Sequence, residues 1–342
     1  MNKNKSNSIN VLKFLLFLLV ITGAIITGCG SNTNTKPAAQ NNNNQKGTAY
    51  TVTDAQGTKV TFTKKPMRII AQSMTFDTLL LGVVPPERLV ACNILCGKED
   101  FSFVVEETKN IPVKLTMFNY IPTDTVLKLK PDIIVLPGTA KPEMIQTFRD
   151  LGFPVLVCKS NNSIQDVRDN LTLLGKALQE EKAAEKAIAE MDRQLDEIHQ
   201  VLAEKKKPWP VGMLVSQMTS YGGKGSMFDV LCTEAHVTNG IAHVGLHSGE
   251  KLTKELVIKA DPDFFMVSAP TKKDYYKSED FKKEFLSDPA YKGLRALNNI
   301  VEIPNKYLYT NSQNCVYAIK GIANYAYGNI FDLKEEKLIK GY

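Results

Sequence analysis

Side chains that could bind a metal ion are spread unevenly along this chain of 342 residues. His236, His243 and His247 lie close together in the second half, whereas no histidine precedes His199. A bare zinc or manganese ion needs imidazoles and carboxylates that converge from several segments. The distribution therefore argues against a bare-metal site, and we predict neither a resident metal nor another intrinsic cofactor.

The cysteines and the glycine-rich stretches offer no catalytic motif. Cys92 and Cys96 are spaced as Cys-x3-Cys, a pattern that could form a local disulfide or contribute to a metal site, and both alternatives stay open. The stretch "GGKGS" resembles a phosphate-binding loop, but Gly225 separates its lysine from its serine. No Gly-x-Ser-x-Gly nucleophile elbow occurs. We predict no catalytic residue and no enzymatic activity, and a hydrolase with scattered catalytic residues is the alternative.

The first half of the chain alternates strand and helix patterns. Apolar and polar residues alternate on both sides of Asp54 to Gly57, which predicts a β-hairpin. Buried strands are expected within 68–71, 87–93, 129–138 and 153–160, and helices within 74–82 and 141–152. Strands that alternate with helices form a parallel sheet, and such sheets bind ligands at the loops that follow the carboxyl ends of the strands.

A long helical pattern follows these elements. Apolar residues at three-and-four spacing predict one helix of about 26 residues from Glu180 to Lys205, roughly 39 Å long. Pro208 cannot extend that helix. The predicted span is longer than one small domain needs, so the helix could bridge two lobes.

The second half then repeats the first. Strand and helix patterns recur in a similar order, and setting 125–138 beside 256–269 aligns Pro131-Asp132 with Pro262-Asp263. We therefore predict an α/β fold of two similar lobes with central parallel sheets. The lobes span 48–162 and 208–342, and the helical segment 163–207 joins them.

The amino terminus has the layout of an export signal with a point of attachment. The apolar run from Phe14 to Thr27 follows several lysines, and it is shorter than the roughly 20 residues that a membrane-spanning helix needs. Such a run with a small-residue end is typical of a secretory signal. Ile26 to Cys29 resembles the bacterial lipobox, in which the cysteine carries a lipid. We predict a signal peptide at 1–28 and, at 29–47, a lipidated Cys29 with a flexible asparagine-rich tether; the alternative is an ordinary signal with an incidental cysteine.

The charge of the chain is too small to indicate a nucleic-acid partner. The formal net charge is +6, and removal of the signal peptide with its three lysines leaves about +3. Nucleic-acid-binding domains carry strong basic patches. We therefore predict no nucleic-acid partner.

Several stretches together resemble one protein family. The lipobox and tether, "VTFTKKPMRII", "LKPDIIVLPG", the long helix, "SYGGKGSMFDVL" and "DPAYKGLRALNN" occur in the order typical of class III substrate-binding lipoproteins of ABC importers. The resemblance implies Rossmann-like lobes, a rigid bridging helix and a ligand cleft between the lobes. It also implies a monomer, lipid-anchored outside the cytoplasm, that delivers its ligand to an ABC permease with ATPase subunits. Members capture ferric siderophores, cobalamin or haem. We expect a ferric siderophore, with cobalamin or haem as alternatives and a bare metal as a weaker one.

The loops after the predicted strands supply the candidate ligand contacts. These candidates are Met74, Met117, Tyr120, Thr139, Tyr221, Lys224 and His247. A tyrosine can stack on a catecholate or a corrin, although Tyr120 and Tyr221 could equally be partly buried core residues. Lys224 could pair with an anionic ligand or simply face solvent. For haem, Met117 and His247 are a conceivable axial pair.

Carboxylates on each lobe dock into arginine pockets of the permease in this family. The resemblance places this role on Glu143 in the first lobe and on Glu279 or Asp274 in the second. An acidic residue in the first turn of a helix also suits the helix dipole. For Asp124 and Glu255, which match one another across the repeat, we prefer that dipole role.

Overall fold

The computed structural model describes residues 49–342 except 117–119, 217, 272–277 and 310. The described residues belong to one compact unit that begins at Lys46. Cys29, Met117 and Asp274 lie outside the described residues. Across the described ranges, no helix combines the length and the apolar character that crossing a membrane requires.

The chain enters the first lobe through the predicted hairpin. Strands β1 (Tyr50–Thr53) and β2 (Lys59–Phe62) pair antiparallel. The carboxylate of Asp54 accepts the backbone N–H groups of Gln56 at 2.9 Å and Thr58 at 2.8 Å, which holds the turn. Gly57 has a φ of +80°, a conformation that favours glycine.

The central sheet of the first lobe is parallel. Its strands, in spatial order, are β7 (Val155–Cys158), β6 (Ile133–Pro137) and β3 (Ile69–Ala71). A parallel bridge between Ile69 and Leu89 brings the pair β4 (Ala91–Asn93) and β5 (Val113–Leu115) to the other edge of β3. The strands are continuous apolar runs because both faces of the sheet are covered.

The second lobe repeats this strand order. Its parallel strands, in spatial order, are β11 (Ile300–Ile303), β10 (Phe264–Ser268), β8 (Val211–Val215) and β9 (Thr238–Asn239). Thus β8 corresponds to β3, and β10 to β6. A residue in the left-handed conformation, Lys130 in one lobe and Asp261 in the other, ends the helix before β6 and before β10. The structure therefore confirms the repeat and the α/β class.

Helices flank both sheets. In the first lobe they are α1 (Met74–Leu81), α2 (Val105–Thr108), α3 (Thr123–Leu129) and α4 (Pro142–Asp150), with 3₁₀ turns η1 (Pro86–Arg88) and η2 (Ile94–Gly97). In the second they are α7 (Met227–Glu234), α8 (Gly240–His243), α9 (Lys254–Ala260), α10 (Ser278–Leu286), α11 (Asn305–Tyr309) and α12 (Cys315–Tyr327), with η3 (Pro289–Tyr291) and η4 (Arg295–Asn298). The shortest elements, such as α8 and α11, were not predicted because a single turn shows no periodicity.

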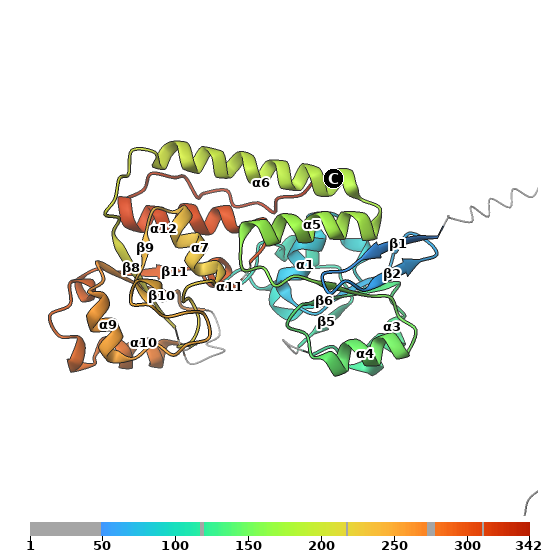
Figure 1. Ribbon diagram of the computed structural model, residues 1–342, viewed down its shortest axis with the longest axis horizontal. Helices are drawn as coiled ribbons and strands as arrows, with labels where there is room; N and C mark the ends of the chain where they lie inside the picture. Colours follow the sequence, from blue (N-terminus) through green and yellow to red (C-terminus); the bar gives the residue numbers. More distant parts are fainter. Residues whose placement is uncertain (1–48, 117–119, 217, 272–277, 310) are drawn as a thin grey trace, which may run out of the picture. The chain divides into compact units, whose positions relative to one another are not determined.

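Two further helices, α5 (Ile164–Leu178) and α6 (Glu181–Leu202), connect the lobes. Helix α6 lies along α5 and α12 in Figure 1. Arg168 of α5 forms an ion pair with Asp192 of α6 at 2.8 Å, and Lys320 of α12 donates to Gln194 of α6 at 2.9 Å. Helix α6 has 22 residues, or roughly 33 Å, so the predicted span of 26 was too long.

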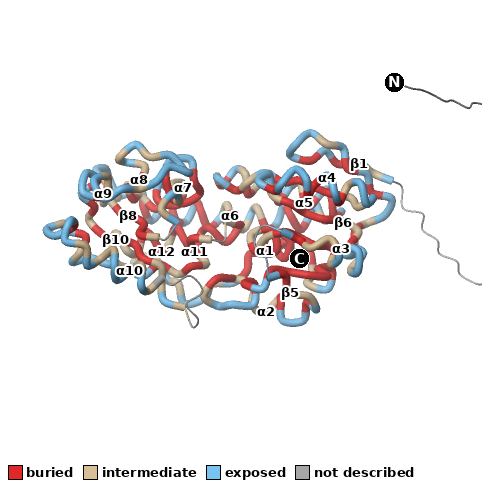
Figure 2. Tube along the Cα trace, turned by 90° about the horizontal axis from the view of Figure 1, so that it is seen from below, coloured by how far each residue is buried: buried red, intermediate tan, exposed pale blue. Residues whose placement is uncertain are grey.

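One apolar core runs through both lobes and the connecting helices. It takes in one face of the first sheet through Ile69, Ile133 and Val135. The opposite face, with Ile70 and Ile134, packs in a second cluster against α4. Figure 2 shows the buried segments along the strands of both lobes.

After α12 the chain returns from the second lobe to the first. We call residues 333–342 the carboxyl-terminal strap; in Figure 1 the strap runs between α6 and α12. The amide of Gln313 donates to the carbonyl oxygen of Ile339 at 3.0 Å, and the N–H of Gly341 donates to the carbonyl oxygen of Gly82 at 3.0 Å. The strap thereby fastens the two lobes together, a feature that the sequence did not predict.

Candidate functional site

The carboxyl ends of strands from both sheets meet at one segment of the chain. The hydroxyl of Thr75, just after β3, donates to the carbonyl oxygen of Tyr309 at 3.5 Å. The amide of Asn161, just after β7, donates to the carbonyl oxygen of Asn311 at 2.6 Å. From the second lobe, Ser216 follows β8, and its hydroxyl lies 3.4 Å from the hydroxyl of Tyr309. These five residues and Gln72 form what we call the strand-end cluster.

Local structure fixes the first-lobe members of this cluster. Ser73 caps α1 by accepting the backbone N–H of Phe76 at 3.4 Å, which places Thr75 in the first turn of that helix. Asn161 is held by the buried amide of Asn170, which donates to its side-chain oxygen at 2.5 Å. The same amide of Asn170 donates to the carbonyl oxygen of Lys159 at 2.9 Å. The loop after β7 is therefore pinned to α5.

Two acceptor oxygens of the strand-end cluster have no donor within the described part of the chain. They are Oε1 of Gln72 and Oδ1 of Asn311. Gln72 is 3% exposed and directly follows β3. Buried polar atoms are nearly always hydrogen-bonded. A ligand or solvent that donates hydrogen bonds would therefore find two acceptors at this edge.

Tyr221 supports the cluster from the second lobe. Its hydroxyl donates to the carbonyl oxygen of Leu308 at 2.7 Å, and its ring lies 6.1 Å from that of Tyr309. Burial raises the pKa of Tyr221, so the hydroxyl remains a donor at neutral pH. Tyr221, Ser216 and Met218 line a recess of about 120 Å³ that continues toward α9 and α10.

The other predicted contact residues do not all gather at this cluster. Met74 begins α1 and is 7% exposed, so its side chain belongs to the core. Lys224 and His247 are exposed, and their backbones pair in an isolated parallel β-bridge. Tyr120 is 41% exposed, and Thr139 is exposed in the loop after β6. Because Met117 lies outside the described residues, its pairing with His247 stays a prediction.

Sequence reasoning missed Asn161, Ser216, Tyr309 and Asn311. The signal was available, because the loops at the carboxyl ends of strands were already expected to bind the ligand. Tyr309 and Asn311 lie between β11 and α12, in a stretch whose sequence is "NKYLYTNSQN". Applying the strand-end rule to β11 as well would have found them.

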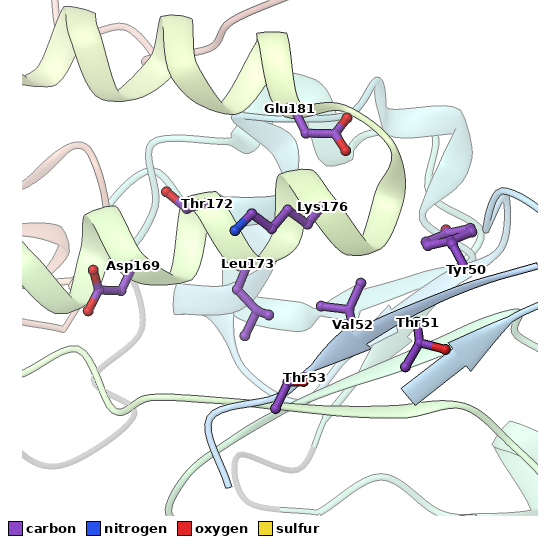
Figure 3. A pocket seen from close by; sticks show the side chains of 9 residues that line it. All are labelled: Tyr50, Thr51, Val52, Thr53, Asp169, Thr172, Leu173, Lys176 and Glu181. Atoms are coloured by element: carbon purple, nitrogen blue, oxygen red, sulfur yellow. The ribbon is translucent and has the colours of Figure 1, made fainter. Parts of the chain in front are cut away.

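A larger groove lies on the outer side of the first lobe. Figure 3 shows residues of β1 facing Asp169, Leu173 and Lys176 of α5, with Glu181 at the start of α6. The groove has a volume of about 670 Å³. Its walls are a two-stranded hairpin and a helix, and the carboxyl ends of the central strands do not line it. We therefore assign no ligand to this groove.

The described residues include no group of three or more histidine, cysteine, aspartate or glutamate side chains that could hold a metal ion. The five cysteines within these residues, Cys92 and Cys96 among them, are free and buried. The predicted docking acids differ in environment. Glu143 is exposed in the first turn of α4, whereas Glu279 pairs with Lys282 on α10 at 3.2 Å.

Comparison with known proteins places these features in context. A family model described as a periplasmic binding protein matches residues 78–307. An uncharacterized ABC transporter substrate-binding lipoprotein of Bacillus subtilis (strain 168), YvrC, is 23% identical over 274 residues, which are 77% of this chain and 82% of that protein.

Solved structures with similar folds come from other bacteria. The apo form of the periplasmic heme-binding protein RhuT from Roseiflexus sp. RS-1 is 18% identical, with a TM-score of 0.65 over 77% of this chain and 99% of that one. Helicobacter pylori CeuE in a nickel and histidine complex is also 18% identical, with a TM-score of 0.65 over 83% of this chain and 90% of that one. At such identities the likeness concerns the fold.

Proposed function

Because the chain belongs to the periplasmic binding protein family, we propose that it is the substrate-binding component of an ABC importer and that its ligand is a ferric siderophore. The protein binds its ligand outside the cytoplasm and releases it to the permease unchanged. It is a carrier without catalytic turnover. The substrate-binding lipoprotein of Bacillus subtilis supports the importer role.

The observation that carries this proposal is the convergence of strand ends from both lobes on Tyr309 and Asn311. The groups presented there are hydroxyls, amides and a phenol. Such neutral groups hydrogen-bond the oxygens and N–H groups of a chelator whose metal is already fully coordinated. The uneven distribution of histidines makes direct coordination of a bare metal the weaker alternative.

The experiment is a binding panel with the soluble chain from Gly30 onward. Ferric catecholate and hydroxamate siderophores, cobalamin, haemin and nickel or zinc chloride are each mixed with protein and passed over a gel-filtration column. We expect a ferric siderophore to co-elute with the protein at one equivalent, detected by its visible absorption. Co-elution of cobalamin or haemin alone would replace the siderophore by that alternative. Binding of none of the chelates at micromolar concentration would overturn the proposal.

The visible absorption of the chelate is a better signal of binding than tryptophan fluorescence, because the single tryptophan lies at the end of the second lobe opposite the strand-end cluster. Trp209 stacks on His236 with 4.5 Å between ring centroids, just before the amino end of β8. The strand-end cluster lies at the carboxyl end of the same strand. A ligand bound there is not expected to quench Trp209 strongly.

Anchoring and docking complete the proposed role. Cys29 carries a lipid, and the asparagine-rich segment up to residue 47 is a tether of roughly 20 Å by the random-coil rule. The protein therefore stays at the outer face of the cell membrane. Glu143 on the first lobe and Glu279 or Asp274 on the second contact the permease, which works with its ATPase subunits. The carrier acts as a monomer.

A further inference from the structure

A buried cluster of two thiols, a carboxylate and an amine lies in the first lobe. Cys92 is the central residue of β4, and Cys96 lies in the 3₁₀ turn η2 that follows. Asp77 comes from α1, and Lys114 comes from β5. Both cysteines and Asp77 are fully buried. None of these four residues belongs to the strand-end cluster.

The contacts give the two sulfurs different surroundings. The thiol of Cys96 donates to Oδ2 of Asp77 at 3.4 Å, and the sulfur of Cys92 is a second acceptor within its reach, so its single proton serves one of the two at a time. The ammonium of Lys114 donates to the sulfur of Cys92 at 3.4 Å. Oδ2 of Asp77 accepts the backbone N–H of Asn93 at 2.7 Å. Cys92 thus faces two donors, whereas Cys96 faces acceptors.

The pKa values of the two thiols differ in accordance with these surroundings. The hydrogen bond from Cys96 and the charge of Lys114 outweigh burial and lower the pKa of Cys92 to about 7. Burial and the hydrogen bond to Cys92 raise the pKa of Cys96 well above its ordinary value. Burial also raises the pKa of Asp77. At neutral pH Cys92 is therefore the sulfur with thiolate character, and the thiolate is the form that attacks disulfides.

The remaining cysteines in the described ranges differ from this pair. Cys158, Cys232 and Cys315 are buried, and burial raises the pKa of each thiol. They come from β7, α7 and α12 respectively. They are expected to behave as small apolar side chains, and they provide an internal reference for reactivity.

We propose that Cys92 and Cys96 form a reversible dithiol–disulfide pair that is oxidised by thiol–disulfide exchange. The Cys92 thiolate attacks one sulfur of an external disulfide, which forms a mixed disulfide and releases the first thiolate. The released thiolate takes the proton of Cys96, and the sulfur of Cys96 attacks Sγ of Cys92. The second thiolate leaves. Two cysteine thiols are thereby oxidised while one external disulfide is reduced to two thiols.

The position of the pair allows access without global unfolding. In the η2 turn, Ile94 and Gly97 are exposed although Cys96 between them is buried. The turn is held by a few local hydrogen bonds, including Leu95 N–H to the side chain of Asn93 at 2.9 Å. Short 3₁₀ turns at the surface open at low cost in free energy. Opening of this turn displaces Cys96, and because Cys96 hydrogen-bonds the sulfur of Cys92, we infer that the displacement uncovers that sulfur as well.

The oxidising surroundings proposed for the protein favour the disulfide form, because exported proteins meet disulfide oxidants that cytosolic proteins do not. The chemistry itself does not depend on the ligand. Failure of the ligand panel would therefore leave the dithiol proposal intact, and failure of the dithiol proposal would leave the importer role intact.

The first experiment measures the redox state directly. The soluble chain from Gly30 is equilibrated in mixtures of reduced and oxidised glutathione, quenched with acid, unfolded and alkylated for mass spectrometry. We expect two of the five thiols, Cys92 and Cys96, to be protected together in one two-electron transition. Alkylation of all five thiols after oxidised glutathione, or protection that includes Cys158, would overturn the proposal.

Variants separate the roles of the two sulfurs. Cys96→Ser should accumulate a stable mixed disulfide with glutathione at position 92, because the resolving thiol is gone. Cys92→Ser should not react at position 96. Equal reaction of both variants would contradict the assignment of Cys92 as the attacking sulfur. Far-UV circular dichroism of each variant verifies that it is folded.

Lys114 is tested as a positioning residue through a pH profile. The rate of exchange with a small aromatic disulfide should rise with a midpoint near pH 7 in the unmodified chain. Lys114→Gln should move that midpoint upward and slow exchange at pH 7 by about three- to tenfold. Lys109→Gln, at a lysine paired with Glu106, is the matched control and should leave the profile in place. An unchanged profile in Lys114→Gln would show that Lys114 does not activate Cys92.

Discussion

Asp132 and Asp263 make the same hydrogen bonds in the two lobes. The backbone N–H of Asp132 donates to the carbonyl oxygen of Arg68 at 2.7 Å, and its carboxylate accepts the N–H of Arg68 at 3.0 Å. In the second lobe, the backbone N–H of Asp263 donates to the carbonyl oxygen of Val211 at 2.8 Å, and the carboxylate of Asp263 accepts the backbone N–H of Val211 at 2.8 Å. Each aspartate thus fastens the start of one central strand to the start of its neighbour.

Asp132 should make the stability of the protein sensitive to acid. Burial acts to raise the pKa of Asp132, but Lys64 and the N–H groups of Met67 and Arg68 outweigh it and lower the pKa. A lowered pKa in the folded state stabilises the fold above the unfolded value, and this contribution is lost as the pH falls through the folded pKa. Asp132→Asn should therefore be less stable than the unmodified protein at neutral pH. The difference in unfolding free energy between the two proteins should shrink as the pH falls from about 5 to about 2.

The measurement for Asp132 is urea unfolding across that pH range. Asp124→Asn is the control, because Asp124 is exposed and forms no ion pair within the described part of the chain. Its exposed charge interacts only with the start of α3 and is screened by solvent, so the change in unfolding free energy with pH should be smaller in the control than in Asp132→Asn. A deficit of Asp132→Asn that stays constant with pH would contradict the assigned contribution.

Tyr309 should contribute to ligand affinity rather than to stability. Its hydroxyl lies 3.4 Å from Ser216, and its ring packs against Tyr221. Tyr309→Phe keeps the ring and removes the hydroxyl, so we expect affinity to fall by about three- to thirtyfold while the unfolding midpoint stays unchanged. Titration with the chelate identified in the binding panel measures the affinity.

Tyr325→Phe is the matched control for Tyr309. Its hydroxyl donates to the carbonyl oxygen of Glu302 at 2.7 Å, and that residue lies within β11 rather than at its carboxyl end. The control should bind the ligand like the unmodified protein. Equal affinities of the two variants would remove Tyr309 from the binding site.

The sequence predicts the larger elements of this fold for identifiable physical reasons. The alternation at Tyr50 to Phe62 and the apolar runs at Ile133 and Phe264 are strong because each strand is buried in a regular way. The Pro-Asp pairs revealed the repeat because both aspartates make the same backbone contacts. Local patterning was sufficient at these places.

Other features depend on contacts that local patterning does not encode. The pairing of Cys96 with Asp77 joins a 3₁₀ turn to a helix 19 residues earlier in the chain. The carboxyl-terminal strap has no periodicity, since its burial comes from a few residues such as Leu338 and Ile339. Tyr309 was missed for a different reason, because the strand-end rule was not applied to β11.

Gly341 should be required for the close packing of the carboxyl-terminal strap against α6. A Cβ atom at this position would lie 1.8 Å from the carbonyl oxygen of Ala183, in the first turn of α6. The backbone of the strap therefore has to move in Gly341→Ala, which we expect to lower the free energy of unfolding by about 1–3 kcal/mol. Gly97→Ala is the control, since a Cβ there meets no atom within 4 Å. Denaturant unfolding compares the two, and equal stability would contradict the close approach at Gly341.

Cys29 should determine whether the protein remains at the membrane. Without the thiol no lipid can be attached, so Cys29→Ala should move the protein from the membrane fraction to the soluble fraction. Ser31→Ala, two residues further on, is the control and should stay with the membrane. Fractionation of expressing cells and immunoblotting measure the distribution. Membrane association of Cys29→Ala would contradict the lipid anchor.

Glu143 and Glu279 should affect delivery of the ligand and leave its capture unchanged. Glu143 is exposed at the start of α4, and Glu279 lies in the first turn of α10, where it pairs with Lys282. Among the described residues, neither carboxylate forms a hydrogen bond or an ion pair with a member of the strand-end cluster. Charge-assisted hydrogen bonds to arginines of a permease would be lost in the double variant Glu143→Ala, Glu279→Ala. We expect uptake of the chelate by cells to fall about tenfold at unchanged affinity of the purified protein.

The control is Asp124→Ala with Glu255→Ala, because these acids also lie in first turns, those of α3 and α9. Equal loss of uptake in both double variants would mean that any first-turn acid has this effect, and normal uptake in the first would move docking to Asp274 or elsewhere on the surface.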